Sequence, residues 1–414
     1  MAIKTLGEVA TYINGRAFKP EEWEEAGKPI IRIQNLTNSS QVCNRTTRTY
    51  EDKYIVHSGD LLFAWSASLG AHIWDGEDGW LNQHIFKVVP NPDVHKMYLY
   101  YYLLHVVDQL YAKTHGSGMV HITLKPFKAT QIPVPTYAVQ MRIVNRIEYL
   151  FAKLDEAKEK AQSVLDSFET RKAAILHKAF TGELTAKCRA EHGDGQEEWQ
   201  RTSIGAIADV KGGKRVPKGM ELTTEDTGHP YIKAGNLKQG TVIDDGMMYV
   251  PDDVLQYIKN YTVQAGDVYI TNVGACIGDC GVIPPKYDGA NLTENAVKIT
   301  NLRCNSDYLA LFLASNTVQQ SIKSLIASAT LGKLSIANIK TIAIDLPSSK
   351  EQMEIVSIIK RLFSKEQRAK DAAEAVLEKI DLLKKSILAR AFRGELGTND
   401  PTEEPALELL KSVL

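Results

Sequence analysis

The sequence lacks the features that mark membrane, secreted and zinc-binding proteins. It has no apolar run near the roughly 20 residues that a membrane span needs, and Met1–Ala10 does not have the pattern of a signal peptide. The five cysteines are odd in number and scattered, which favours a reducing cytoplasm over a disulfide framework. Cys276 and Cys280 have no second ligand pair nearby, so we expect ordinary buried thiols and no zinc site. We therefore expect a cytoplasmic protein with no membrane partner.

The sequence also lacks an excess of charge of one sign. It has 49 Lys and Arg against 50 Asp and Glu, for a net charge of −1. A basic surface is the usual first sign of a nucleic-acid-binding protein, and this composition does not provide it. The balance does not exclude that class, because cations can gather on one face. A subunit of a larger complex can also leave part of the phosphate neutralisation to its partners.

Motifs of the common catalytic centres are absent as well. There is no Asn/Asp-Pro-Pro-aromatic motif or Gly-rich cofactor loop of a DNA methyltransferase, and no phosphate-binding loop of the G-x₄-G-K-[ST] type. Pro251-Asp252 is not followed by the acid-x-Lys that a nuclease metal site requires. None of the ten histidines has ligand spacing such as H-x₃-H. We expect no catalytic residue, no metal and no cofactor in this chain.

An internal repeat dominates what is present. Residues 132–184 align without a gap with residues 344–396, at a constant offset of 212 positions. Identical pairs occur from one end to the other: Gln140-Met141 with Gln352-Met353, Leu150-Phe151 with Leu362-Phe363, and Gly182-Glu183-Leu184 with Gly394-Glu395-Leu396. With 414 residues, the chain is long enough for two or more domains, and the repeat predicts two copies of one unit.

The segment before each repeat corresponds more loosely. PIIRIQNL at 29–36 resembles PYIKAGNL at 230–237, and LNQHIFKV at 81–88 resembles LTENAVKI at 292–299. The offset drifts from 198 to 212 along these segments, so the loops differ in length while the frame is kept. Variable loops on a fixed frame are typical of proteins that recognise two different targets.

These patterns predict an α+β fold with two globular mixed α/β domains, each followed by a long helix. The predicted order is a first globular domain at 1–135, a helix at 136–184, a polar linker at 185–200, a second globular domain at 201–347, a helix at 348–396, and a tail at 397–414.

Both long helices carry an apolar stripe in which the spacing alternates between four and three residues. The predicted pairing positions are Ile143, Ile147, Leu150, Leu154, Val164 and Phe168 in the first helix, and Ile355, Ile359, Leu362, Val376, Ile380, Leu383 and Ile387 in the second. Each stripe contains one charged residue, Arg171 or Glu366, and Gly182 and Gly394 follow the helix ends as caps. We expect an antiparallel coiled coil with pseudo-twofold symmetry and helices on the order of 60 Å long. The plainer alternative is a helical hairpin that only stabilises the fold.

Two loops have the composition of a phosphate-binding surface. Lys211, Lys214, Arg215 and Lys218 surround two glycines, and Arg16 and Lys19 occupy the corresponding loop of the first copy. Nearby, Arg32 with Asn35 and Lys233 with Asn236 are side chains of the types that read guanine and adenine. The alternative for each residue is an ordinary solvated side chain.

Taken together, these motifs resemble those of specificity subunits of type I restriction–modification systems. The resemblance rests on the two copies, the I-x-[VL]-P…Q-M-x-I-V…L-F pattern that leads each helix and the A-F-x-G-E-L pattern that ends it, and it covers nearly the whole chain. The tail from Asp400 to Ala406 is also similar. One departure is Val139, where the second copy has Glu351.

The resemblance implies two target-recognition domains that each read one half of an asymmetric double-stranded DNA site, across a spacer set by the helices. Two modification subunits, which bind S-adenosylmethionine and methylate adenine, would dock on the helices. Restriction subunits that use ATP with Mg would join that core. Two alternatives are a non-enzymatic coiled-coil scaffold for protein partners and, disfavoured by its missing motifs, a self-sufficient methyltransferase.

Overall fold

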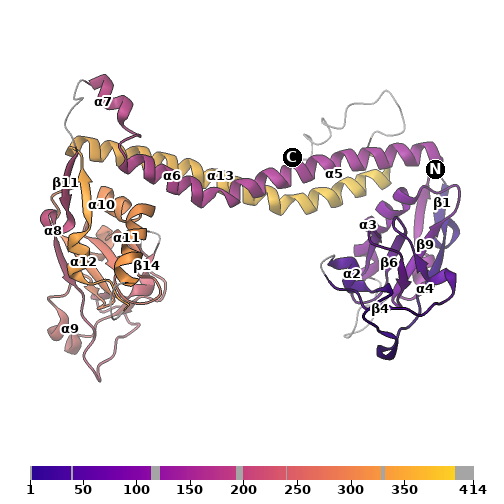
Figure 1. Cartoon of the computed structure of the whole chain (residues 1–414), viewed down its shortest axis with the longest axis horizontal. Coiled ribbons are helices and arrows are strands. Elements are labelled where there is room, and N and C mark those ends of the chain that lie inside the picture. The colour runs from indigo at the N-terminus through magenta and orange to yellow at the C-terminus, as the bar shows by residue number, and fades with distance from the viewer. Residues whose placement is uncertain are drawn as a thin grey trace. The chain divides into compact units, whose positions relative to one another are not determined.

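The computed structural model divides the chain into two compact units, shown in Figure 1. Unit 1 comprises Met1–Gln162 with Ala373–Leu414, and unit 2 is the continuous segment Ser163–Ala372. The structure describes residues 2–38, 41–112, 122–192, 199–238, 240–327 and 332–396. The predicted tail at 397–414 and part of the predicted linker lie outside the described residues.

Unit 1 contains the first globular domain, which is built on two four-stranded sheets. The first is antiparallel, with the order β2 (Ala10–Asn14), β9 (Ile85–Pro90), β6 (Leu61–Ala64), β7 (Gly70–Ile73). The second has the order β4 (Arg45–Thr46), β3 (Lys28–Ile31), β8 (Gly79–Leu81), β5 (Ile55–Val56), with β3 and β8 parallel. A further pair joins β1 (Ala2–Thr5) to β10 (Gln131–Val134). The helices of this domain are α1 (Leu6–Val9), α2 (Ile33–Thr37), α3 (Lys96–Ala112) and α4 (Leu124–Lys128).

Unit 2 contains the second globular domain, which repeats this plan. Its antiparallel sheet has the order β12 (Asp209–Gly212), β20 (Ala296–Thr300), β17 (Val268–Thr271), β18 (Cys280–Val282). Beside it lie the sheet β16 (Met248–Tyr249), β13 (Pro230–Ile232), β19 (Asn291–Leu292), the hairpin β14 (Leu237–Lys238) with β15 (Thr241–Val242), and the pair β11 (Gln200–Ser203) with β21 (Ala343–Leu346). Its helices are α7 (Ala186–His192), α8 (Ile204–Ile207), α9 (Asp252–Ile258), α10 (Ser306–Leu313), α11 (Asn316–Ala327) and α12 (Ile336–Thr341). The predicted α+β class is confirmed.

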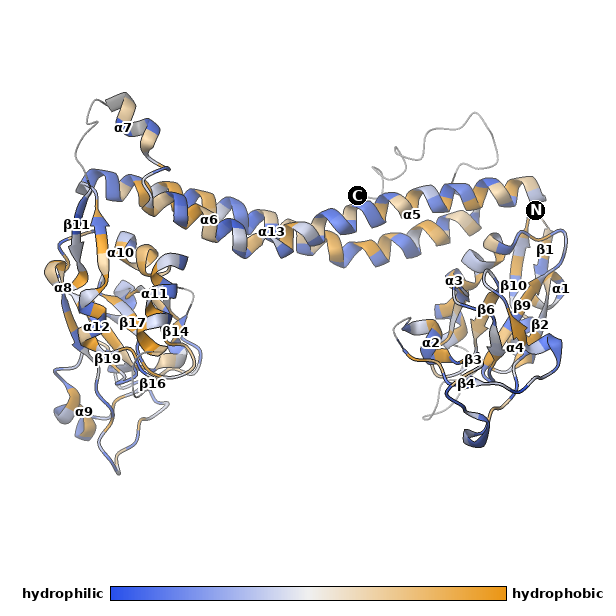
Figure 2. Cartoon of the chain, in the orientation of Figure 1, coloured by the Kyte–Doolittle hydropathy of each residue, from blue (hydrophilic) through white to orange (hydrophobic). Residues whose placement is uncertain are grey.

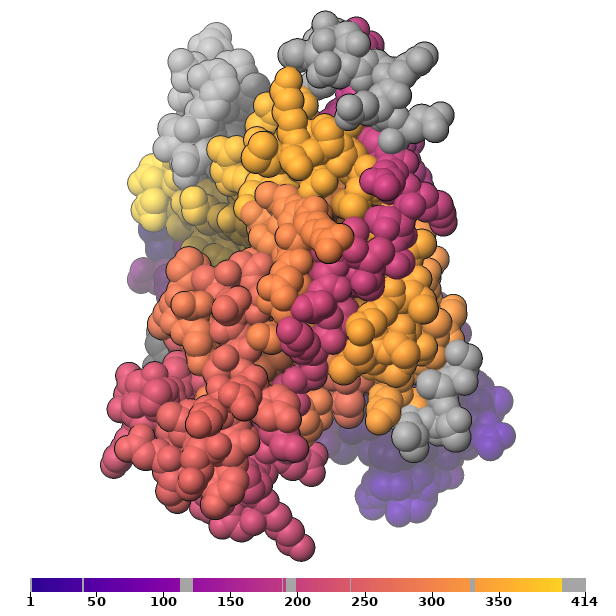
Figure 3. Space-filling view, turned by 90° about the vertical axis from the view of Figure 1, so that its left-hand side faces the viewer, coloured from indigo at the N-terminus to yellow at the C-terminus, as the bar shows by residue number. Residues whose placement is uncertain are grey.

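The long helices contribute to both units. The first is interrupted at Ser167, so α5 (Tyr137–Asp166) and α6 (Phe168–Phe180) replace the single predicted helix, whereas α13 (Ser349–Arg393) is continuous. In unit 2, α6 runs antiparallel to α13: the amine of Lys370 lies 5.0 Å from the Phe168 ring, and Lys172 lies over the Phe363 ring. Figure 3 faces this unit and shows α6 in magenta against orange residues of the same unit.

Most of the predicted apolar stripe is buried. Buried positions are Ile143, Ile147, Leu150, Leu154, Phe168, Ile355, Ile359, Ile380 and Ile387, and half-buried positions are Val164, Leu362 and Leu383. Val376 was predicted wrongly, because its side chain is 40% exposed. The stripe instead advances from Ala373 to Leu377 and then to Ile380, which leaves Val376 about 100° away around the helix. Figure 2 shows apolar and polar residues alternating along these helices.

The repeated A-F-x-G-E-L motif packs each helix end onto a globular domain. In unit 1, Phe392 at the end of α13 makes edge contacts with Tyr98 and Tyr102 of α3, at centroid distances of 5.3 and 4.9 Å. In unit 2, Phe180 at the end of α6 makes the equivalent contacts with the α10 residues Tyr308 and Phe312. Each long helix therefore ends on the domain encoded by the other half of the sequence.

The motif glycines and glutamines have clear structural roles. Gly182 and Gly394 have φ values of +78° and +77°, the left-handed conformation of a helix C-cap, as predicted. Gln140 is fully buried, and its carbonyl accepts a hydrogen bond from the backbone of His95 at 2.8 Å. Gln352 makes the same 2.8 Å contact with the backbone of Asn305. These shared contacts account for the identity of these residues in the two copies.

Two expected absences, and the expected burial of two cysteines, concern the described residues alone. No described helix is long and apolar enough to cross a membrane, and no group of described His, Cys, Asp and Glu side chains is arranged to hold a metal. Of the two cysteines expected to be buried, Cys280 is half-buried and the pKa of its thiol is raised to about 12 by burial. Cys276 is exposed, so that expectation is wrong for it; it lies in a loop after β17.

The two charged residues of the apolar stripes neutralise each other. Arg171 Nε lies 2.6 Å from Glu366 Oε2 within unit 2, and both side chains are partly buried. Arg171 also donates a hydrogen bond from Nη2 to the carbonyl of Val164 at 3.1 Å, which helps satisfy the backbone where α5 ends. Arg171 therefore connects the interruption at Ser167 with Glu366 of α13.

We predict that Arg171→Leu or Glu366→Leu alone will lower the free energy of unfolding by about 1–3 kcal/mol, because each leaves a partly buried charge without its partner. The double variant should recover much of that decrease, because both positions become apolar. Denaturant unfolding of the four proteins measures the coupling, with Leu382→Ala, at a 67% exposed position of α13, as the control. Additive decreases would show that the pair does not stabilise the helices.

Candidate nucleic-acid interface

The two globular domains share a frame of backbone hydrogen bonds at the end of the antiparallel sheet. Five bonds of unit 1 have direct equivalents in unit 2, with the same donor and acceptor positions. They are Gly15–Ile85 with Gly213–Ala296, Arg16–Leu81 with Lys214–Leu292, Asn82–Ile31 with Thr293–Ile232, Trp65–His84 with Asn272–Asn295, and Ile122–Trp65 with Leu334–Asn272. This set of contacts is called the shared frame below. It brings the predicted cationic loop beside two segments that are distant in the sequence.

One glycine in each domain is fixed by close backbone approach. A Cβ atom at Gly15 would lie 2.0 Å from the carbonyl oxygen of Asn82, and a Cβ at Gly213 would lie 2.0 Å from that of Thr293. Only glycine fits at these positions. The cationic residue that follows, Arg16 or Lys214, therefore starts from the same backbone point in both domains.

In unit 1 the predicted contact Arg16 is held in place by its neighbours. Its Nη1 lies 2.8 Å from Glu22 Oε1, and its guanidinium lies over the rings of Phe18 and Tyr50 at 4.6 and 4.0 Å. The backbone N–H of Lys19, followed by Arg16 and Tyr50, lowers the pKa of Glu22 to about 2, so this carboxylate stays charged. Much of the charge of Arg16 is thus balanced locally, whereas Lys19 is exposed.

In unit 2 the predicted cations divide into two groups. Arg215 Nε lies 2.6 Å from Glu294, and Lys211 lies 3.3 Å from Asp209. Lys214 and Lys218 are exposed, and neither forms an ion pair with another described residue. Lys214 extends over the ring of Tyr261 at 5.6 Å. Lys214 and Lys218 are therefore the cations of this loop best placed to meet a phosphate.

The predicted base-reading asparagines are engaged elsewhere. Asn35 is 6% exposed and Asn236 is 1% exposed. Their Oδ1 atoms accept hydrogen bonds from the backbone of Arg32 and Lys233, at 3.0 and 3.1 Å, and their amide nitrogens donate to loop carbonyls. Both residues brace a turn, and this geometry does not favour the prediction that they read bases.

Arg32 and Lys233, the cations predicted to read bases beside these asparagines, are only partly accessible. Arg32 is half-buried, lies over the Trp23 ring at 5.3 Å and donates to Asn44 at 3.2 Å. Lys233 is also half-buried. Both remain candidates for contacts made through the outer end of the side chain.

Sequence reasoning missed four residues that the shared frame brings next to the cationic loops. They are Trp65 and His84 in unit 1, and Asn272 and Asn295 in unit 2. The aligned segments LNQHIFKV and LTENAVKI carried a signal for half of them, because their central polar residues differ while their apolar residues are kept. Trp65 and Asn272 lie in loops with no comparable alignment.

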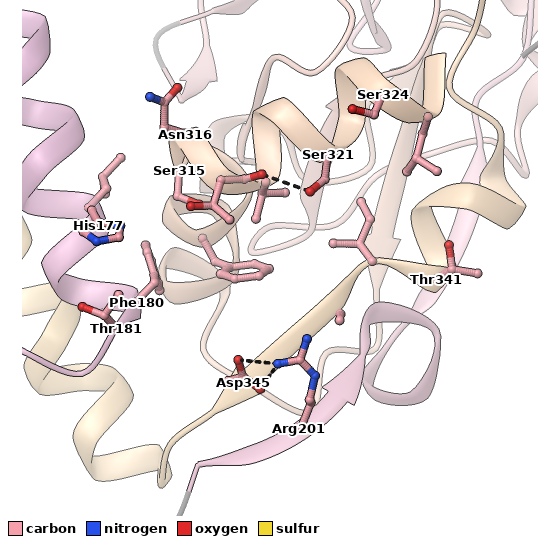
Figure 4. Close-up of a pocket in the computed structure, with 17 residues that line it drawn as sticks. His177, Phe180, Thr181, Arg201, Ser315, Asn316, Ser321, Ser324, Thr341 and Asp345 are labelled. Atoms are coloured by element: carbon pink, nitrogen blue, oxygen red, sulfur yellow. Dashed lines mark hydrogen bonds and ion pairs between the residues drawn. The ribbon is translucent and has the colours of Figure 1, made fainter. Parts of the chain in front are cut away.

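A pocket of about 860 Å³ lies within unit 2, where the end of α6 meets the globular domain (Figure 4). His177 and Phe180 line it from α6, Ser321 and Ser324 from α11, and none of the predicted contact residues lines it. Arg201 and Asp345 also line it and form an ion pair at 3.3 Å. In unit 1 the residue equivalent to Phe180 is Phe392, and the ring of His105 stacks on it at a centroid distance of 5.5 Å.

Comparison with known proteins agrees with this architecture. The model of the family described as "Type I restriction modification DNA specificity domain" matches residues 1–165 and 196–378. The chain is 26% identical to the type I restriction enzyme EcoBI specificity subunit of Escherichia coli, over 97% of this chain and 88% of that protein. It is 22% identical to the EcoKI specificity subunit of Escherichia coli strain K12, over 98% of this chain and 91% of that protein.

Solved structures show the same fold. The HsdS subunit from Thermoanaerobacter tengcongensis superposes with a TM-score of 0.66 at 17% identity, covering 95% of this chain and 97% of that one. A chain from a study of complex assembly and conformational transition of the type I R-M system gives 0.65 at 18% identity, covering 95% and 98%. Because the family model matches both halves of the chain and well over half of its residues, the chain belongs to the type I restriction–modification DNA specificity family.

Proposed function

We propose that this chain is the DNA sequence-specificity subunit of a type I restriction–modification complex. Each globular domain acts as a target-recognition domain and reads one half of an asymmetric double-stranded DNA site. The observation that carries this proposal is the shared frame, in which five equivalent backbone hydrogen bonds support different side chains in the two domains. Such a pair of domains can present two different reading surfaces from one architecture.

The chemistry of the complex belongs to other subunits in this proposal. Modification subunits would bind S-adenosylmethionine and methylate adenine, restriction subunits would use ATP with Mg, and this chain would catalyse nothing.

The docking surface we favour for the modification subunits lies on the long helices. Met141 of α5 is 44% exposed and its repeat equivalent Met353 of α13 is 57% exposed, so each copy presents an apolar side chain at the same position. A role in binding DNA agrees with the expected cytoplasmic location of the chain.

The non-enzymatic scaffold is the competing function, and DNA selection separates the two. The full chain, with and without a modification subunit, is incubated with duplexes that carry a randomised central region, and bound DNA is sequenced. We expect salt-sensitive binding that enriches one motif in two halves separated by an unread spacer. Failure to enrich any motif, with the modification subunit present, would support the scaffold.

The free cations of unit 2 should bind phosphates of the DNA backbone. We predict that replacing Lys214 and Lys218 by Ala weakens binding to all sequences and makes the slope of log K against log salt shallower by about one for each phosphate that is no longer neutralised. Arg215→Ala should change the slope less, because Glu294 already balances that charge at 2.6 Å. Filter binding over a range of salt concentrations measures the slopes. A shifted consensus with an unchanged slope would assign these lysines to base reading instead.

The long helices are proposed to set the length of the unread spacer. Inserting seven residues after Gln162 and seven after Ala372, where the chain passes between the units, lengthens both helices by about 10 Å and keeps the seven-residue repeat. We predict a spacer longer by about three base pairs, with both half-sites unchanged. Selection from random duplexes measures it, with insertion into one helix alone as a control for disrupted pairing. An unchanged spacer with intact binding would leave the helices as a docking surface only.

A further inference from the structure

Unpaired polar atoms gather at one point of the shared frame. At this point, three buried side-chain atoms of the described residues have no hydrogen-bond partner: His84 Nδ1, Thr271 Oγ1 and Asn272 Oδ1. Buried polar groups in folded proteins are nearly always paired. These atoms lie beside the cationic loops in both domains, which makes this point of the shared frame a candidate for contact with a ligand.

In unit 2 this point is formed by two asparagines from different loops. Asn272 directly follows β17 and Asn295 directly precedes β20, and the backbone N–H of Asn272 donates to the carbonyl of Asn295 at 3.0 Å. The backbone N–H and carbonyl of Asn272 are both used by the frame, the latter by the N–H of Leu334 at 3.0 Å. The frame therefore fixes the main chain of Asn272 and leaves the oxygen of its side chain without a partner.

In unit 1 the same point carries a different pair. Trp65 directly follows β6, and its backbone N–H donates to the carbonyl of His84, also at 3.0 Å. The two ring centroids are 4.9 Å apart, and Trp65 Nε1 donates at 3.0 Å to Asn14 Oδ1, at the end of β2 directly before the cationic loop. His84 has a φ of +74°, an uncommon conformation for a residue with a side chain, and it persists here without a glycine.

We propose that Asn272 with Asn295 in unit 2, and Trp65 with His84 in unit 1, are equivalent base-reading pairs of the two recognition domains. The proposal rests on the DNA-specificity function stated above and assigns the side chains that distinguish one half-site from the other. The cationic loops lie beside these pairs through the bonds of Gly15 and Gly213, so phosphate contact and base contact arise from adjoining parts of the frame.

The chemistry of the two pairs differs in the way that two half-sites require. A carboxamide can donate to and accept from the N6 and N7 edge of adenine, so the unit 2 pair is suited to an A·T base pair in the major groove. The indole and imidazole of unit 1 offer a bulkier apolar surface and a different set of donors and acceptors. Unit 1 is therefore expected to prefer a different base pair at the equivalent position of its own half-site.

The test is selection of bound DNA from random duplexes by the full chain with a modification subunit. Asn272→Ala with Asn295→Ala should lower discrimination at an A·T position of one half-site by about tenfold or more, while the other half-site is unchanged. Asn316→Ala, at an exposed asparagine in the same unit, is the matched control and should leave the consensus as it is. Thermal unfolding of each variant establishes that the domain is folded.

A reciprocal variant keeps the proposal testable if the double substitution unfolds unit 2. His84→Asn retains a residue type that tolerates positive φ, and it should alter the half-site read by unit 1 alone. A consensus that stays the same in folded variants, or a decrease in affinity that is uniform across sequences, would overturn the assignment. Absence of any enriched motif with the unsubstituted chain would instead overturn the DNA-specificity function.

Discussion

The apolar side of α13 has to be covered along a helix of 45 residues, and the rest of the structure follows from how this is done. In unit 1 that side joins the core that holds Ile143, Ile147 and α3, and in unit 2 it joins the core of α6 and α10. A long exposed apolar stripe would promote aggregation, so the helix pairing and the globular domains stabilise each other. The aromatic contacts of Phe180 and Phe392 then fix each helix end on a domain.

The near-zero net charge of the chain has a local counterpart at the shared frame. Around the shared frame, cations are matched by nearby carboxylates, as in Arg16 with Glu22 and Arg215 with Glu294. Of the described cations predicted for the two loops, Lys19, Lys214 and Lys218 form no ion pair, which limits the phosphate contacts that these loops can make by themselves. Specific binding would then depend more on base contacts and on cations of partner subunits, as suits a subunit whose role is to discriminate between sequences.

The sequence predicted the helices well because their determinants are local and repeated. The cap glycines and most of the apolar stripe follow from the local sequence, whereas the interruption of the first helix at Ser167 was not predicted. Val376 failed because Val376 and Leu377 are adjacent and both apolar, so spacing cannot decide between them. Asn35 and Asn236 present a different difficulty: in the sequence, an asparagine that braces its own turn looks the same as one that reads a base. Trp65 and Asn272 were missed because the sheet, and no aligned sequence segment, brings them beside the cationic loops.

The division of the chain also has a consequence for biosynthesis. Unit 2 is one continuous segment that is complete once Ala372 has been made, whereas unit 1 needs residues from both ends of the chain. Domains generally fold as units as they leave the ribosome. The domain translated first is therefore the last to obtain all of its core, because Ile387, Ala391 and Phe392 are synthesised after the whole of unit 2. The apolar side of α5 stays uncovered until about two hundred further residues have been translated. Translation that stops early therefore releases a chain in which that side is exposed.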